Sequence, residues 1–530
     1  MIKKILPVLA LVAVSISFIL LYLQQTHNYL RFSDGAKYAD IALNLVEDKG
    51  YLKRFNFFSS RAIVWPHNKL FEARNFPPLV PYSVAIMFKV WGISDFTVIL
   101  ASSIYFIGTV VMTYLLGRRL FNGTVGILSS LAVASNINLL DYATSGASET
   151  AFIFLILLAV YLIVRRNRYS LLSALVVLLL LYLTRPQAVV YILGVVFLMM
   201  LFKFGYKRSI TLITIVSLAG LLVDRLIIYP LSIRYSNIMP LFERGLQAIN
   251  VHLISESPSD ILRGAATEAS GTFVLIRKVF YNLFNFYRRI PDIMSPYLLF
   301  AFVLGIFIKS KEETVEKTKF MVLFVTVLTF LTAALTIPFF RYIHPIVPLV
   351  YIFGVGTFFI VSNRLKLSKI IPISLITFFV IVLSVLTMLV DVRFNRTIYN
   401  FGKPPVYTLL GEKLRLITHE NDVIVTNLDT WGSWYGERKT VWLPLEPEKL
   451  IPSKDELTVD AIYITDYLMD DENYYLGEGW REILNAPEKI SETVLGGKFE
   501  GYQVIQINAQ DTYEKIPARG VLIWRKNGSK

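Results

Sequence analysis

Long apolar blocks, separated by short polar breaks, run through the first three quarters of the chain. About 20 apolar residues span the hydrocarbon core of a bilayer as a helix. The pattern predicts about eleven membrane-spanning helices, near residues 5–24, 96–117, 124–141, 146–164, 169–184, 187–202, 209–229, 293–308, 320–338, 343–361 and 370–391. The predicted fold class is therefore an α-helical polytopic membrane protein.

One region decides the number of crossings. Residues 169–202 are long for one helix and short for two, but both flanks are basic, so we expect two crossings. Arg185 and Pro186 mark the natural break, because proline removes a backbone donor and arginine does not rest in lipid.

The polar breaks also predict orientation. Short basic segments face the cytoplasm by the positive-inside rule, and they lie at residues 3–4, 118–119, 165–168, 203–208, 309–319 and 363–369. The N-terminus is then cytoplasmic, and the loops 25–95 and 230–292 face outside. The first apolar run is expected to stay as an uncleaved span, because no small-x-small cleavage site follows it.

Two domains are expected. Residues 1–391 form the transmembrane domain, and residues 392–530 form a small soluble α/β domain on the extracytoplasmic side of the cell membrane. Short buried strands are predicted at 423–426 and 461–464, with helices at 412–417 and 480–484.

The first outer loop is predicted to begin with an amphipathic helix. Its apolar side carries Tyr38, Ile41, Ala42 and Leu45, and its polar side carries Lys37, Asp40, Asn44 and Glu47. Such a helix would lie in the plane of the membrane interface. The 230–292 loop is also expected to be helical.

Composition supports a membrane protein. The 530 residues are 55% hydrophobic and 17% charged, whereas about a quarter of a soluble domain is charged. The net charge of +14 does not indicate a nucleic-acid partner, because residues 392–530 carry 17 basic and 21 acidic residues. The positive excess therefore belongs to the membrane domain's loops. Cysteine is absent, which excludes disulfides and thiolate chemistry.

Two acids at the predicted outer surface are the first functional candidates. Asp34 follows the first span, and Glu149 opens the span at 146–164. Ionisable residues held at such positions usually serve function. The structural alternatives are that Ser33 or Asp34 caps a helix and that Glu149 offsets a helix dipole. Asp141 is a weaker candidate in the same turn.

Arginines at the outer ends of spans are candidates for phosphate binding. Arg185 and Arg341 both lie there, and guanidinium groups suit bidentate contact with phosphate. Contact with lipid headgroups is the alternative for each. Arg74, before a proline pair, is a further candidate for phosphate binding, whereas His344 is more often a packed residue. Trp431 and Trp434 are candidates for stacking against a sugar ring.

Taken together, these motifs resemble the polytopic GT-C glycosyltransferases. The nearest branch is the dolichyl-phosphate-mannose-protein mannosyltransferase-like one, which includes bacterial enzymes that decorate lipid A and lipopolysaccharide core. Each motif is weak alone, but the set is in family order over residues 1–360. The matching stretches are Asp34–Tyr38 with Ala42 and Leu45, Pro77–Pro81, Phe88–Gly92, Ser148–Thr150, Leu183–Pro186, and Arg341–Tyr342 with Pro345 and Pro348.

The resemblance implies a catalytic base at Asp34, a second acidic site residue at Glu149 and a polyprenyl-phosphate sugar donor. The residues that would then contact the substrate phosphate are Arg74, Arg185, Arg341 and Tyr342.

Two positions depart from the family pattern. The family often has Asp-Glu where this chain has Asp34-Gly35, which weakens a metal assignment and leaves a divalent ion at Glu149 open. It also has a basic residue immediately before the proline pair, where this chain has Phe76.

The expected reaction is an inverting transfer of a sugar to a hydroxyl of a protein, lipid or glycan, in which Asp34 takes the proton. A secondary transporter is the alternative, although its binding site would lie near the midplane of the membrane. A scaffold protein, in which Asp34 only caps a helix, is a third reading.

Overall fold

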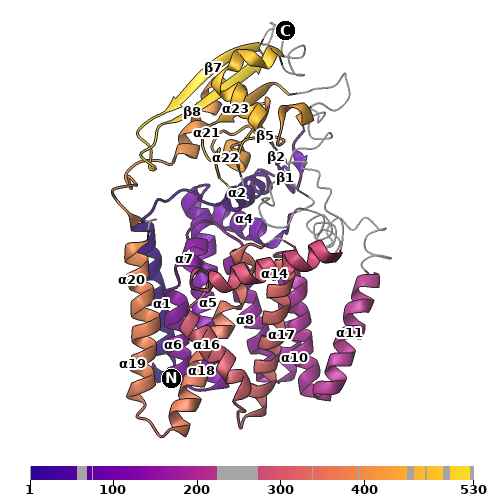
Figure 1. Ribbon diagram of the computed structural model, residues 1–530, viewed down its shortest axis with the longest axis vertical. Helices are drawn as coiled ribbons and strands as arrows, with labels where there is room; N and C mark the ends of the chain where they lie inside the picture. The colour runs from indigo at the N-terminus through magenta and orange to yellow at the C-terminus, as the bar shows by residue number, and fades with distance from the viewer. Residues whose placement is uncertain are drawn as a thin grey trace.

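The computed structural model describes residues 2–56, 69–73, 76–223, 272–336, 338–391, 394–450, 459–471, 474–492 and 502–525. Figure 1 shows a bundle of helices that run roughly side by side, with a domain built around a β-sheet at one end. The short elements α2 and α4 lie at the junction between the two.

The bundle follows the predicted spans. Its helices are α1 (Ile2–Gln24), α5 (Asp95–Leu120), α6 (Gly123–Ala134), α7 (Ile137–Ala143), α8 (Glu149–Arg165), α9 (Arg168–Tyr182), α10 (Ala188–Phe204), α11 (Tyr206–Val223), α16 (Pro296–Phe307), α17 (Glu313–Leu335), α18 (Val347–Arg364), α19 (Ile370–Ile376) and α20 (Leu383–Val390). The predicted span at 209–229 is described only to Val223.

Length and composition support several membrane crossings. In the described part of the chain, four helical stretches are long and apolar enough to span a bilayer, namely Ile5–Gln24, Asp95–Leu120, Glu313–Leu335 and Phe340–Arg364. The pair α6 and α7 would make a fifth if it counts as one span, and shorter apolar helices lie beside these. The chain is a multi-pass helical membrane protein, as predicted.

The predicted break inside residues 169–202 is confirmed. Helix α9 ends at Tyr182 and α10 begins at Ala188, so Arg185 and Pro186 lie between two separate helices. By contrast, the predicted helix at 124–141 is bent by 67° between α6 and α7. Asn136 explains the bend, because its side chain accepts hydrogen bonds from the first backbone N–H groups of α7.

Helix α2 (Ser33–Val46) forms as predicted, but protein covers more of it than the amphipathic pattern indicates. Most of its predicted polar side is buried as well, since the exposed fractions of Lys37, Asp40 and Asn44 are 8%, 0% and 1%, whereas Glu47, just past the end of the helix, is exposed. Asp40 accepts a hydrogen bond of 2.7 Å from the backbone N–H of Arg54. The helix packs against α4 (Leu79–Trp91) and against α22 (Asp429–Trp434) of the sheet domain. Protein therefore covers both of its sides.

The sheet domain has the predicted α/β character. Among the described residues, six strands lie in the order β2-β5-β4-β6-β8-β7, parallel from β2 to β6 and antiparallel from β6 to β7. The strands are β2 (Phe55–Asn56), β4 (Val423–Thr426), β5 (Lys439–Trp442), β6 (Ala461–Thr465), β7 (Tyr502–Ala509) and β8 (Ala518–Arg525), and the principal helices are α21 (Val406–Ile417), α22 and α23 (Glu478–Asn485).

The edge strand β2 comes from the first outer loop rather than from the C-terminal part of the chain. Phe55 pairs with Thr440 of β5. Nearby, β1 (Leu52–Lys53) and β3 (Phe71–Glu72) form a separate two-stranded antiparallel sheet. The first outer loop is thus part of the sheet domain's structure.

The second outer loop is described only in its last part, because residues 230–271 lie outside the described ranges. Residues Thr272–Arg288 form α14, and Ile290–Ile293 form the short α15. Figure 1 shows α14 lying across the bundle near the sheet domain.

Candidate functional site

The two acids singled out from the sequence meet at one guanidinium group. Arg341 Nη2 lies 2.9 Å from Asp34 Oδ2, and Arg341 Nε lies 3.7 Å from Glu149 Oε1. Arg185 forms a second ion pair with Glu149, through Nη1. The structure therefore brings two acids and two arginines, all predicted as site residues, into one ionic cluster.

Four separate elements deliver these side chains. Asp34 lies in the first turn of α2, and Glu149 is the first residue of α8. Arg185 lies in the break between α9 and α10, and Arg341 lies in the short helix Phe340–Tyr342 just before α18. Each is an end of a helix or a connection, where a charged side chain can leave the apolar bundle.

A close backbone contact sets the separation of the acids. A side chain on Gly35 would collide with the carbonyl oxygen of Ser145, and the neighbouring Gly146 has φ +75°. Only glycine allows α2 to approach the 145–148 turn so closely. Packing therefore explains why glycine stands at position 35.

Polar atoms at the centre of the cluster lack hydrogen-bond partners. Among the described residues, none is found for either carboxylate oxygen of Glu149 or for Nε of Arg341, although all three are buried. Buried polar groups in folded proteins are nearly always hydrogen-bonded. Since ion pairs alone hold Glu149, these atoms are suited to meet a further polar ligand.

The charge state of Asp34 is set by its cationic neighbours. Lys37 Nζ lies 3.3 Å from Asp34 Oδ1. Burial by itself would raise the pKa of Asp34, but Arg341, Lys37 and Arg185 outweigh it and hold the pKa well below its ordinary value. The carboxylate is therefore ionised at neutral pH, and it is a weak base while these cations stay in place.

The remaining predicted phosphate contacts differ in position. The guanidinium carbon of Arg341 lies 5.8 Å from the centre of the Tyr342 ring, so Tyr342 borders the cluster. Arg74 lies outside the described residues.

The residues present do not fit a metal ion at Glu149. Within the described ranges, no group of three His, Cys, Asp or Glu side chains is arranged to hold one. Arg185 and Arg341 both contact Glu149, and a divalent cation placed there would be repelled by both guanidinium groups.

Three residues of the site were not identified from the sequence. Ser148 Oγ accepts hydrogen bonds from Arg185 Nη1 at 3.0 Å and from Tyr38 OH at 3.1 Å. Lys37 contacts Asp34 as described above. Asp34, Lys37 and Tyr38 have i, i+3 and i+4 spacing, which places them on one face of a helix. That spacing could have identified Lys37 and Tyr38 from the sequence as neighbours of Asp34.

Other candidates have structural roles. Asp141 forms an ion pair with Arg31 at 2.9 Å, and Nδ1 of His344 lies 2.6 Å from the hydroxyl oxygen of Tyr142. The indole N–H of Trp431 donates to the carbonyl of Leu30, and only 4% of the Trp431 side chain is exposed. This tryptophan therefore packs inside the domain junction instead of presenting a face to a sugar.

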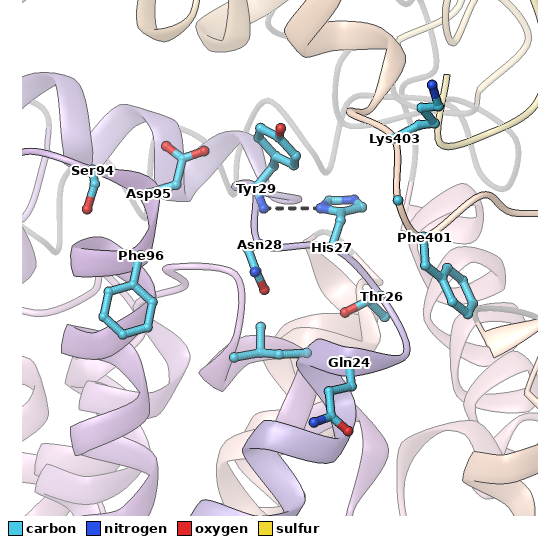
Figure 2. Close-up of a pocket in the computed structure, with 12 residues that line it drawn as sticks. Gln24, Thr26, His27, Asn28, Tyr29, Ser94, Asp95, Phe96, Phe401 and Lys403 are labelled. Atoms are coloured by element: carbon cyan, nitrogen blue, oxygen red, sulfur yellow. Dashed lines mark hydrogen bonds between the residues drawn. The ribbon is translucent and has the colours of Figure 1, made fainter. Parts of the chain in front are cut away.

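A pocket of about 630 Å³ lies apart from this cluster, at the adjoining ends of α1 and α5 (Figure 2). Its lining includes Thr26, His27, Asp95, Phe401 and Lys403. None of the site residues predicted from the sequence lines it.

Comparison with known proteins supports the predicted resemblance. Residues 75–233 match the family model described as dolichyl-phosphate-mannose-protein mannosyltransferase. The comparison with curated proteins gives no match. The chain is similar in structure to ArnT from Cupriavidus metallidurans bound to undecaprenyl phosphate, with a TM-score of 0.54, 11% identity and 98% coverage of both chains.

A second similar structure is the Archaeoglobus fulgidus oligosaccharyltransferase in complex with Zn and sulfate. Its TM-score is 0.50 with 12% identity, over 94% of this chain and 72% of that one. The GT-C resemblance and the predicted fold class are confirmed at the level of the fold.

Proposed function

Because the chain has the fold of the GT-C membrane glycosyltransferases, we propose that it is an inverting glycosyltransferase that uses a polyprenyl-phosphate sugar donor. The observation that carries this proposal is the bridge that Arg341 makes between Asp34 and Glu149. In this arrangement the proposed base, Asp34, lies in the same ionic cluster as Arg185 and Arg341, the two arginines proposed to bind phosphate. The similar ArnT structure holds undecaprenyl phosphate, which supports a lipid phosphate as the carrier of the donor.

The reaction is a direct displacement at the anomeric carbon. The acceptor hydroxyl oxygen attacks from the face opposite the phosphate, and the bond between the anomeric carbon and the phosphate oxygen breaks. The electron pair of that bond leaves with the polyprenyl phosphate, and the hydroxyl proton goes to Asp34. One displacement inverts the configuration of the sugar.

The arginines bind the phosphate and offset the charge that builds on it as it leaves. Arg341 is also the main cation that lowers the basicity of Asp34. When the donor phosphate draws Arg341 toward itself, Asp34 loses that partner and becomes a stronger base. Binding of the donor therefore prepares the base for the acceptor.

The membrane setting suits such a donor. The polyprenyl tail stays in lipid while the sugar phosphate reaches the junction of the bundle and the sheet domain. Tyr342 borders the phosphate, and Arg74 is a further contact outside the described residues. In the proposed orientation the N-terminus is cytoplasmic and the sheet domain faces outside, where a protein, lipid or glycan supplies the acceptor hydroxyl.

The proposal is tested with the full chain in nanodiscs and a panel of labelled short-chain polyprenyl-phosphate sugars. Mass spectrometry should detect release of polyprenyl phosphate together with transfer of the sugar to an extract of cell-envelope acceptors. Arg341→Met should abolish transfer. The matched control Arg415→Met, at an exposed arginine paired with Glu437, should retain it. Movement of a solute across the membrane without sugar transfer would instead indicate a transporter.

A further inference from the structure

The sheet domain is fastened to the start of α2 by side-chain hydrogen bonds. Thr430 Oγ1 donates to the carbonyl of Ser33 at 2.9 Å, and Trp431 Nε1 donates to the carbonyl of Leu30 at 3.0 Å. The backbone N–H of Leu30 donates to the hydroxyl of Tyr435 at 3.0 Å. These bonds fix α22 against the segment that carries Asp34.

A second set of hydrogen bonds holds α22 to the start of α5. Trp434 Nε1 and Tyr435 OH donate to the two carboxylate oxygens of Asp95, at 2.7 Å and 2.6 Å. With bonds to both α2 and α5, the position of α22 relative to the ionic cluster is defined from two directions.

This docking brings a third carboxylate to the cluster. Asp429 Oδ2 lies 3.7 Å from Lys37 Nζ, and Lys37 Nζ lies 3.3 Å from Asp34 Oδ1. Only 3% of the Asp429 side chain is exposed. Asp429 and Asp34 therefore share the ammonium group of Lys37. Charges that are buried in this way interact with little screening by salt.

The backbone at Asp429 is in a conformation that few residues other than glycine, asparagine and aspartate adopt. Its φ is +48°, in the left-handed region that glycine adopts most easily. The hydroxyl of Thr440 donates to the Asp429 carbonyl at 3.2 Å and supports this conformation. What singles out Asp429 is that it is a buried acid in contact with a lysine of the ionic cluster, which points to a role for its side chain.

The electrostatic surroundings agree with such a role. Burial raises the pKa of Asp429, Lys37 opposes that rise, and the nearby Asp34 adds to it. Lys37 is thus the main cation, ahead of Lys53, that lowers the pKa of this buried acid against the effect of burial. The dependence is mutual, because Asp429 holds the Lys37 ammonium in place.

Resting on the proposed function, we infer that Asp429 is a positioning residue, supplied by the C-terminal domain, that holds the Lys37 ammonium beside the carboxylate of Asp34. When Arg341 turns to the donor phosphate, Lys37 is the cation that remains to orient Asp34. The C-terminal domain is therefore a working part of the site.

Steady-state kinetics of the full chain test this role. Asp429→Asn keeps the size of the side chain but removes its charge, so kcat should fall about 10- to 100-fold through misplacement of the base, with KM for the lipid-phosphate donor unchanged. Asp429→Glu should restore part of the loss. In a Lys37→Met background, Asp429→Asn should cause no further loss, because Asp429 acts through Lys37.

Asp511→Asn is the matched control. Asp511 also has a left-handed backbone, with φ +59°, but its side chain is 65% exposed and pairs with Lys403. The same change of carboxylate to amide there should leave kcat within about twofold of wild type. Equal losses in Asp429→Asn and Asp511→Asn, or additive losses with Lys37→Met, would overturn the inference.

Failure of the proposed function gives a different result. If the wild-type chain transfers no sugar, the proposed function fails. The contact between Lys37 and Asp429 is then read from the double-mutant cycle in thermal unfolding. Absence of coupling in that cycle would reject the inference on its own.

Discussion

Arg341 Nη2 lies 2.9 Å from Asp34 Oδ2, so the residue proposed to bind the donor is also the ion-pair partner of the proposed base. The same guanidinium lies close to Glu149. One arginine therefore has three possible anionic partners once a phosphate enters: two carboxylates of the protein and the ligand. The competition between Asp34 and phosphate has measurable consequences.

Removing the charge of Asp34 should tighten the binding of a lipid phosphate. In Asp34→Asn, Arg341 no longer has to leave an ion pair before it contacts phosphate. Kd for a short-chain polyprenyl phosphate should therefore fall about 10-fold or more, since close charge pairs couple by about 1.5 kcal/mol or more. Isothermal titration in detergent measures it. Weaker binding by the variant would show that Asp34 and phosphate do not compete for Arg341.

Removing Arg185 should destabilise the protein strongly. Glu149 is only 1% exposed, and without Arg185 its remaining cation is Arg341 at 3.7 Å. Breaking a buried ion pair from one side costs about 3–5 kcal/mol, so Arg185→Met should lower the unfolding midpoint by several degrees.

A double variant separates the effect of the lost charge pairing from the effect of the changed side-chain size. Arg185→Met combined with Glu149→Leu should recover most of the stability, since no buried charge is then left unpaired. Arg415→Met, at an exposed ion pair, serves as the control and should shift the midpoint little. A double variant as unstable as Arg185→Met would contradict the explanation.

Lys53 should make stability depend on pH above neutrality. Its burial, reinforced by repulsion from Lys37, lowers its pKa to about 7. The pKa of a lysine in an unfolded chain is about 10.4. Between these values the unfolded state binds a proton that the folded state lacks, so the free energy of unfolding should rise with pH by up to about 1.4 kcal/mol per unit.

Chemical unfolding between pH 7 and 10 measures this slope. Lys53→Met should flatten it, whereas Lys49→Met, at an exposed lysine, should leave it unchanged. An identical slope in Lys53→Met and wild type would mean that Lys53 is not the group responsible.

The sequence predicted the core of the site because the membrane limits where charges can lie. Asp34, Glu149, Arg185 and Arg341 stand out as charged residues at the ends of apolar spans, and spans that pack side by side bring such ends together. Their partner Lys37 was assigned to the polar face of a surface helix. The local sequence around Lys37 contains no feature that predicts burial of that helix face by the sheet domain.

Contacts between segments that are distant in the sequence could not be predicted from local sequence patterns. The two-residue strand β2 is too short to give a periodic signal, and its pairing with β5 depends on how the first outer loop docks. Asp429 lies beside Trp431 in a segment whose aromatic residues suggested sugar binding, and only the docked structure shows its contact with Lys37. The bend at Asn136 was readable in principle, because asparagine is a common N-cap.

Sugar transfer by wild type and Asp34→Asn, assayed side by side with a short-chain polyprenyl-phosphate sugar, tests the central claim most directly. Loss of a general base should slow transfer about 10²- to 10⁴-fold, in a variant that inserts into the membrane and unfolds at a midpoint close to that of wild type. An Asp34→Asn protein that transfers sugar at the wild-type rate would contradict the assignment of Asp34 as the base.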